Sequence, residues 1–200
     1  MNYPGFGGDI AGFNNKYVTL ADQIAGPWNI GSVVRLGNHF DPSIDYSESV
    51  VDDLRSAIAC CEEHSRDWFD ADNLTFFLMG FSAGAGAVAA LAGEVHNIEK
   101  ILLAAPSAAA SHDRIQRSLA RFPGECYSAV GTNDDVVGAH AAHQFSSMAK
   151  STRVNKVHLI ENCDHQFRGT RNGRIMASLP LWAFTDRLSE PDESQGVDLY

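Results

Sequence analysis

The chain has 200 residues, of which 44% are hydrophobic, and its 15 Lys plus Arg against 25 Asp plus Glu give a formal net charge of −10. This composition predicts one acidic globular domain and argues against nucleic acid or an anionic membrane as partner, because a negative chain repels phosphate groups. No run approaches the roughly 20 apolar residues of a membrane span, and residues 1–8 lack the basic and then apolar order of a signal peptide, so we expect a soluble cytoplasmic protein.

The chain starts close to a glycine-rich loop, Pro4-Gly5-Phe6-Gly7-Gly8, which only three residues precede. A doubly wound α/β fold normally places a strand directly before such a loop. We therefore expect either that this central strand is absent, so that the run at 32–36 pairs directly with the run at 74–79, or that the chain is an N-terminally truncated form.

Strand-like and helix-like patterns alternate along the rest of the chain. Five β-branched or aromatic runs predict strands at 32–36, 74–79, 101–105, 126–130 and 154–160. Helices are predicted between and after them, at 15–25, 46–63, 83–93, 111–121, 139–150 and 174–188, and Asp45 or Ser47 can cap the second of these. This alternation predicts one α/β domain of three layers with a mostly parallel sheet at 1–188, followed by an acidic, flexible tail at 189–200.

The run at 74–79 leads into Gly80-Phe81-Ser82-Ala83-Gly84 and then into the small-residue helix at 83–93. A strand, a G-x-S-x-G turn and a helix in this order predict a nucleophile elbow, in which glycines are needed because flanking side chains would collide with the strand and the helix. The alternative is a tight turn without reactivity. A dinucleotide fingerprint, G-x-G-x-x-A, also matches at 84–89, but the next predicted strand ends in Ala104-Ala105-Pro106 instead of the acid that the ribose requires.

Two partners for a nucleophilic serine follow later strands. Asp134 comes after the run at 126–130 and His165 after the run at 154–160, at separations of 52 and 31 residues along the order Ser, Asp, His. The carboxyl ends of parallel strands share one edge of a sheet, so the three side chains are expected to meet there. Asp135 competes with Asp134 for the acid, and either residue can instead serve in a turn.

These residues resemble the catalytic triad of the α/β-hydrolase superfamily. The wider pattern is similar to small lidless bacterial hydrolases related to dienelactone hydrolase, in its early Gly7-Gly8, its Asn15-Lys16 and its Asp164-His165-Gln166-Phe167 loop. The resemblance spans about residues 4–185. It departs from the family at Tyr3-Pro4, where His-Pro is common, and in using serine where dienelactone hydrolase itself uses cysteine, so that enzyme's substrate is not implied.

The resemblance and the chemistry imply the same roles. Ser82 would attack a carbonyl, His165 would move the proton, and Asp134 would orient the imidazole. The backbone N–H groups of Ala83 and Phe6, with Gly7 as the alternative to Phe6, would form the oxyanion hole. We therefore expect a serine hydrolase that cleaves a small-molecule carboxylic ester or thioester through an acyl-enzyme, without a metal or an organic cofactor. The alternative is a hydrolase-like binding protein that has lost turnover.

The remaining polar candidates favour ordinary structural roles. The stretch between residues 105 and 126 has room for one crossover helix and not for a cap domain, so an open site is expected. His140 and His143 lack a third metal ligand, and Arg168, Arg171 and Arg174 are either a solvated helix entry or a substrate-carboxylate site. The cysteines show no ligand spacing or disulfide framework, so reduced thiols are expected at Cys60, Cys61, Cys126 and Cys163.

Overall fold

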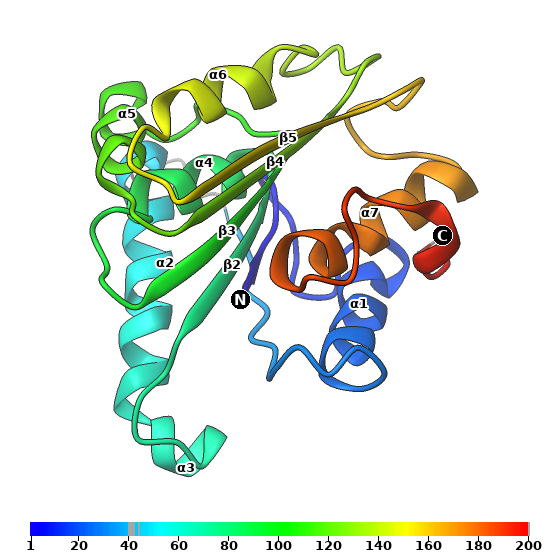
Figure 1. Cartoon of the computed structure of the whole chain (residues 1–200). Helices are drawn as coiled ribbons and strands as arrows, with labels where there is room; N and C mark the ends of the chain where they lie inside the picture. Colours follow the sequence, from blue (N-terminus) through cyan, green and yellow to red (C-terminus); the bar gives the residue numbers. More distant parts are fainter. Residues whose placement is uncertain (40–42, 44, 200) are drawn as a thin grey trace.

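The computed structural model describes residues 1–39, 43 and 45–199. Figure 1 shows a twisted sheet between two layers of helices. Five strands run parallel in the order β1 (Asn2–Tyr3), β2 (Phe76–Phe81), β3 (Ile98–Ala104), β4 (Glu125–Gly131) and β5 (Val154–Ile160). The three-layer α/β architecture predicted from the alternation of patterns is therefore confirmed.

The helices divide between the two faces of the sheet. One face carries α1 (Lys16–Ala25) and α7 (Thr170–Phe184), and the other carries α2 (Tyr46–Glu63), α4 (Ala83–Leu91), α5 (His112–Arg121) and α6 (Ala141–Met148). A short α3 (Ser65–Phe69) and two 3-10 turns, η1 (Phe13–Asn15) and η2 (Glu193–Gln195), were not predicted. The bounds predicted for 46–63 and 154–160 are confirmed, while α7 begins and ends four residues before its predicted bounds.

The strand expected to be absent before the glycine loop is present. Asn2 and Tyr3 form β1 beside Met79 and Gly80 of β2, and on the other side the Asn2 N–H donates to the Val34 carbonyl at 2.9 Å. The prediction of a missing central strand, and of direct pairing between 32–36 and β2, is therefore wrong. A strand needs only two residues here because it is hydrogen-bonded on both sides.

The predicted strand at 32–36 is correspondingly reduced. It makes a single parallel bridge, between Arg35 and Asn2, and Leu36 N–H donates to the Asn2 carbonyl at 3.0 Å. Because β1 offers only two residues for pairing, residues 32–36 remain an extended segment with one bridge.

The amphipathic pattern of α2 is confirmed, with its apolar stripe buried against the sheet and α4. Val50, Leu54 and Ile58 are buried, and the Asp45 carboxylate caps the helix by accepting from the Ser47 N–H at 2.9 Å. None of the helices among the described residues is both long and apolar enough to cross a membrane.

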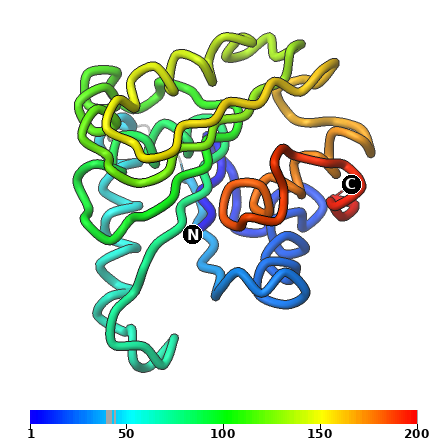
Figure 2. Tube along the Cα trace, in the orientation of Figure 1, coloured from blue at the N-terminus to red at the C-terminus, as the bar shows by residue number. Residues whose placement is uncertain are grey.

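The acidic segment at 189–199 lies against α7. Arg174 donates to Asp198 at 2.6 Å, Arg171 lies 3.6 Å from Glu193, and Leu199 is buried in the core on this face. Figure 2 shows the red C-terminal segment beside α7, whereas the N-terminus lies next to β2, at the β1 end of the strand order. The predicted flexibility of this segment stays a prediction.

Candidate active site

Ser82 lies on a strained turn between β2 and α4. Its φ of 53° and ψ of −117° are sparsely populated for a residue with a side chain. The turn is held from both sides, because Ser82 N–H donates to Ala104 of β3 at 2.9 Å and the Ser82 carbonyl accepts from Ser107 at 3.1 Å. The serine therefore stands at the carboxyl edge of the sheet and at the N-terminus of α4, whose dipole favours negative charge.

The two glycines of the turn permit close backbone approaches. A Cβ at Gly80 would lie 2.5 Å from the Cα of Ala85, and a Cβ at Gly84 would lie 2.3 Å from the carbonyl oxygens of Tyr3 and Pro4. Both positions therefore need glycine for packing, as the elbow pattern predicts. Gly84 in particular lets α4 pack directly on β1 and on the glycine loop that follows it.

His165 connects the serine to a buried carboxylate. Its Nε2 is 3.1 Å from Ser82 Oγ, and its Nδ1 is 2.8 Å from Asp134 Oδ2. The three residues come from the carboxyl ends of β2, β4 and β5, which is why residues far apart in sequence meet. The structure thus brings together the three side chains predicted from strand-end positions.

The choice between the two adjacent acids follows from their burial. The Asp134 side chain is fully buried, and its Oδ1 accepts from the N–H groups of Val136 and Val137, each at 3.0 Å. These bonds fix the carboxylate with Oδ2 toward His165. Asp135 is exposed, so of the two adjacent acids it is the buried Asp134 that contacts the histidine.

The imidazole of His165 also packs on an aromatic ring. Its centroid lies 5.2 Å from that of Phe81, and the Nζ of Lys16 lies 5.2 Å from the same Phe81 ring. Lys16 is buried, and this burial lowers the pKa of its ammonium group. The sequence marked Lys16 only as part of a motif and gave no signal that it approaches the site.

The glycine loop lies beside the serine and is clamped by a residue that the sequence did not single out. A Cβ at Gly5 would lie 3.2 Å from Ser82 Cβ, which places the loop backbone against the nucleophile. Asn38 is 1% exposed; its Nδ2 donates to the Pro4 carbonyl at 3.0 Å and its N–H donates to Gly8 at 2.8 Å. The Tyr46 hydroxyl in turn donates to Asn38 Oδ1 at 2.9 Å. No local pattern could find Asn38, because it acts across 34 residues.

Exposed apolar side chains occur on the loops that carry the site. Phe6 of the glycine loop is 57% exposed, with its ring 4.9 Å from that of Tyr46, and Val136 of the Asp134 loop is 66% exposed. The crossover between β3 and β4 contains α5 and no cap domain, as predicted. The site is therefore open and bordered by apolar surface.

The rival motifs have structural explanations. Gly84 and Gly86 of the dinucleotide pattern allow α4 to contact neighbouring backbone, since a Cβ at Gly86 would lie 2.2 Å from the Ser107 carbonyl oxygen. His140 and His143 are exposed, and the described residues contain no group of three potential metal ligands.

The arginines and the cysteine near His165 also have structural partners. Arg168 lies 3.3 Å from Asp164, and Arg171 and Arg174 contact the acids of the C-terminal segment. Cys163 is buried, and this burial raises the pKa of its thiol to about 12, so it is packed as a neutral side chain.

Comparison with solved structures gives consistent matches at low sequence identity. Est1E from Butyrivibrio proteoclasticus is 15% identical, with a TM-score of 0.58 over 82% of this chain and 78% of that one. An esterase domain from Rhodothermus marinus is 14% identical, with a TM-score of 0.62 over 92% of this chain and 86% of that one. The lipolytic enzymes LipS and LipT, of metagenomic origin, supply a match of 15% identity and TM-score 0.58, over 82% of this chain and 83% of the other.

No family model matches the sequence, and no curated protein does. The more specific relation to dienelactone hydrolase stays a prediction. The parallel sheet, the short β1, the strand-to-helix turn at Ser82 and the matched structures agree with one another. This chain has the α/β-hydrolase fold.

Proposed function

We propose that the protein is a serine hydrolase that cleaves a carboxylic ester or thioester through an acyl-enzyme. The observation that carries this proposal is the continuous contact from Ser82 Oγ through His165 to the buried Asp134 carboxylate, with steps of 3.1 and 2.8 Å. A serine hydroxyl is a weak nucleophile until an adjacent base can take its proton, and this arrangement supplies that base.

In the acylation step, Ser82 Oγ attacks the carbonyl carbon while His165 Nε2 accepts the hydroxyl proton. The imidazolium that forms is stabilised by Asp134, whose buried carboxylate is held by two backbone N–H groups. His165 then gives the proton to the departing alkoxide or thiolate. In deacylation, water attacks the acyl-enzyme, its proton passes to His165, and Ser82 is restored.

The oxyanion of each tetrahedral intermediate needs two donors. Ala83 N–H follows the nucleophile at the start of α4, and Phe6 N–H belongs to the loop that lies against Ser82, with Gly7 as the alternative. The Asn38 clamp on Pro4 and Gly8 supports this assignment, because a donor contributes most when it is positioned before the charge develops.

The proposed substrate is a small-molecule ester with an apolar acyl or alcohol group. The exposed Phe6 and Val136 support an apolar group, and the names of the matched structures, which are esterases and lipolytic enzymes, support an ester bond. The open site also suits substrates whose leaving group extends into solvent.

A fluorophosphonate probe tests the proposal, because it labels only an activated serine. We expect stoichiometric labelling of the wild-type protein at Ser82 and no labelling of Ser82→Ala. Ser111→Ala serves as the matched control and should label like wild type. A folded wild-type protein that resists the probe, and that hydrolyses no ester or thioester from a panel of chain lengths, would instead be a non-catalytic small-molecule binding protein.

A further inference from the structure

The aromatic ring directly before the nucleophile lies against the base. Phe81 is the last residue of β2 and precedes Ser82, and its ring centroid lies 5.2 Å from that of His165, with 38° between the ring planes. Phe81 and His165 are both buried. The distance is typical of favourable aromatic pairs, and it is within the roughly 6 Å at which a cation is attracted to a ring face. The strand that leads into the serine therefore also carries a support for the imidazole.

The loop that supplies His165 contacts the same ring a second time. Phe167 is fully buried, and its ring lies 6.2 Å from that of Phe81 in an edge-on arrangement. Its backbone φ of 56° is an outlier for a bulky residue. Such a conformation costs free energy and persists only where surrounding contacts require it. The loop therefore accepts a strained backbone at Phe167 while both aromatic side chains, those of His165 and Phe167, pack on Phe81.

We propose that Phe81 is a positioning residue for His165, whose ring holds the imidazole at Ser82 and stabilises the imidazolium that forms when Nε2 takes the serine proton. This inference rests on the serine-hydrolase function proposed above. The ring is in place before the charge develops, because Nε2 already lies 3.1 Å from Ser82 Oγ. Burial strengthens the attraction, since little water competes for the positive charge. Phe81 thus supports the ring of the same cation that Asp134 stabilises at Nδ1.

Other charged or titratable groups near His165 also act on the imidazolium. They are the buried Asp134 carboxylate at Nδ1, the Lys16 ammonium on the Phe81 ring, the neutral Cys163 thiol, and the ion pair of Asp164 with Arg168 in the same loop. Asp134 favours the imidazolium and Lys16 opposes it, because opposite charges attract and like charges repel. All of these side chains are unaltered when only the electron density of the Phe81 ring is changed. A response of His165 that follows this density therefore reports the ring.

The test replaces Phe81 with mono-, di- and trifluorinated phenylalanine, substituted at the meta and para carbons. These side chains keep the shape and apolar character of phenylalanine, while each fluorine withdraws negative charge from the ring face. We expect kcat for an ester to fall stepwise, by about tenfold in total, with little change in KM and in the free energy of unfolding. A ring that only fills space would leave kcat unchanged.

A pH readout follows the imidazolium itself. A weaker ring face stabilises the cation less, so a higher proton concentration is needed to form it. The acid limb of the pH profile of kcat/KM should therefore move stepwise to lower pH, by about one unit in total. The titration of the His165 ring followed by NMR should move in the same direction and by the same amount.

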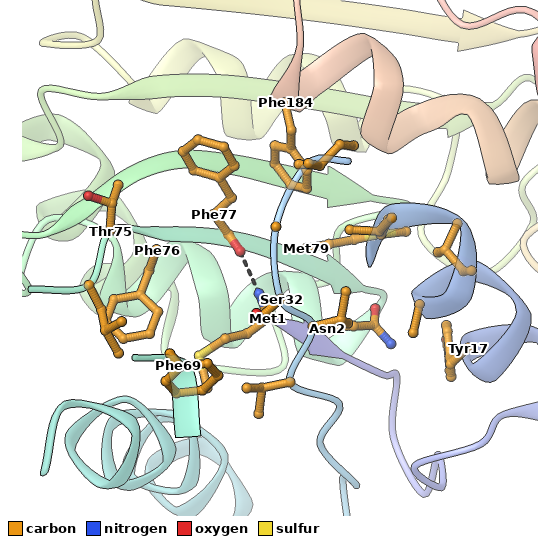
Figure 3. A pocket seen from close by; sticks show the side chains of 18 of the residues that line it. Met1, Asn2, Tyr17, Ser32, Phe69, Thr75, Phe76, Phe77, Met79 and Phe184 are labelled. Atoms are coloured by element: carbon orange, nitrogen blue, oxygen red, sulfur yellow. Dashed lines mark hydrogen bonds between the residues drawn. The ribbon is translucent and has the colours of Figure 1, made fainter. Parts of the chain in front are cut away.

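Phe77 is the matched control on the same strand. Its ring lies 5.4 Å from that of Phe184 (Figure 3), and Lys100 Nζ lies 5.6 Å from its centroid. Phe77 thus resembles Phe81 in having an aromatic partner and a lysine, but it lies four residues earlier, about 13 Å along an extended strand. The same fluorinated residues at position 77 should leave both kcat and the His165 titration unchanged.

A second control separates the effect on His165 from one on Lys16, whose Nζ lies 5.2 Å from the centroid of the Phe81 ring. The fluorinated series at position 81 is repeated in Lys16→Met. The dependence on fluorination should persist there, because the imidazolium remains. Loss of the dependence in Lys16→Met would show that the ring acts through the ammonium, and would overturn the proposal.

Two further results would overturn it. These are a His165 titration that does not move with fluorination of Phe81, and one that moves equally with fluorination of Phe77. The NMR titration needs no turnover, so it separates this inference from the proposed function. A wild-type protein that resists the fluorophosphonate and hydrolyses no ester would refute the function, whereas the titration alone decides whether Phe81 stabilises the imidazolium.

Discussion

At the carboxyl end of β2, Ser82, His165 and Asp134 contact one another in series, and the Asp134 carboxylate has further backbone donors. Beside Met79 of the same strand, the buried Asn2 side chain has no hydrogen-bond partner for its Nδ2 and Oδ1 atoms. Buried polar groups are costly when unpaired, so the polar groups at the carboxyl end are satisfied within the protein, whereas the Asn2 carboxamide is not. The contrast shows that buried polar side chains along one pair of strands can be organised to very different degrees.

The largest expected effect is the loss of activity when Ser82 or His165, at the carboxyl ends of their strands, is replaced. Ser82→Ala and His165→Ala should each lower kcat for an ester by a factor on the order of 10⁴ or more, because members of a triad act as a unit. Steady-state kinetics on variants whose folding is checked by circular dichroism measures this. Retention of most activity in either variant would remove the triad assignment.

The second largest effect on kcat concerns the carboxylate that contacts His165. Asp134→Asn should lower kcat by about 10³ to 10⁴, because an amide stabilises the wrong tautomer of the histidine. Asp135→Asn is the matched control and should cost less than about threefold, since Asp135 is exposed and the Asp134 carboxylate keeps its two backbone donors. The opposite ranking would transfer the role to Asp135.

A smaller effect tests whether the clamp on the glycine loop positions the oxyanion hole. Asn38→Leu removes the bond to the Pro4 carbonyl, so we expect kcat to fall about tenfold with little change in KM, and the free energy of unfolding to fall by about 1–3 kcal/mol. Tyr46→Phe removes the hydroxyl that donates to Asn38 but leaves the Asn38 bond to Pro4, so its kcat should stay within a few-fold of wild type. If Asn38→Leu lowers stability but leaves kcat intact, the clamp is structural only.

The smallest expected effect is that of a thiol reagent, which should not inhibit the protein. Burial raises the pKa of the Cys163 thiol to about 12, so the reactive thiolate is scarce at pH 7 to 9 even though the residue lies close to His165. Iodoacetamide should label the exposed Cys60, as mass spectrometry of the peptides would show, and leave ester hydrolysis unchanged. Labelling of Cys163 with loss of activity would show that this thiol is less buried than the structure indicates.

Local sequence patterns were sufficient to predict that Ser82, Asp134 and His165 lie together. The turn around Ser82 combines a strand, two glycines and a helix in one segment, and Asp134 and His165 follow strands whose carboxyl ends must share an edge. The same patterns could not find Asn38, because its contact with Pro4 joins segments 34 residues apart.

The sequence also could not predict β1. A strand of two residues has no alternation of side chains to detect, and its pairing depends on contacts with β2 and with Val34, which lie far away in the sequence. The unpaired Asn2 side chain arises from how the elements around it pack, and composition carries no signal for a group that lacks a partner.

The central claim is that Ser82 becomes acylated during turnover. Acid quench of the protein during hydrolysis of p-nitrophenyl acetate, followed by mass spectrometry, tests this directly. We predict one acetyl group on the peptide that contains Ser82, formed in a burst equal to the enzyme concentration and absent from Ser82→Ala. Turnover of the ester with no acyl group on Ser82, or with the acyl group on another residue, would contradict the account.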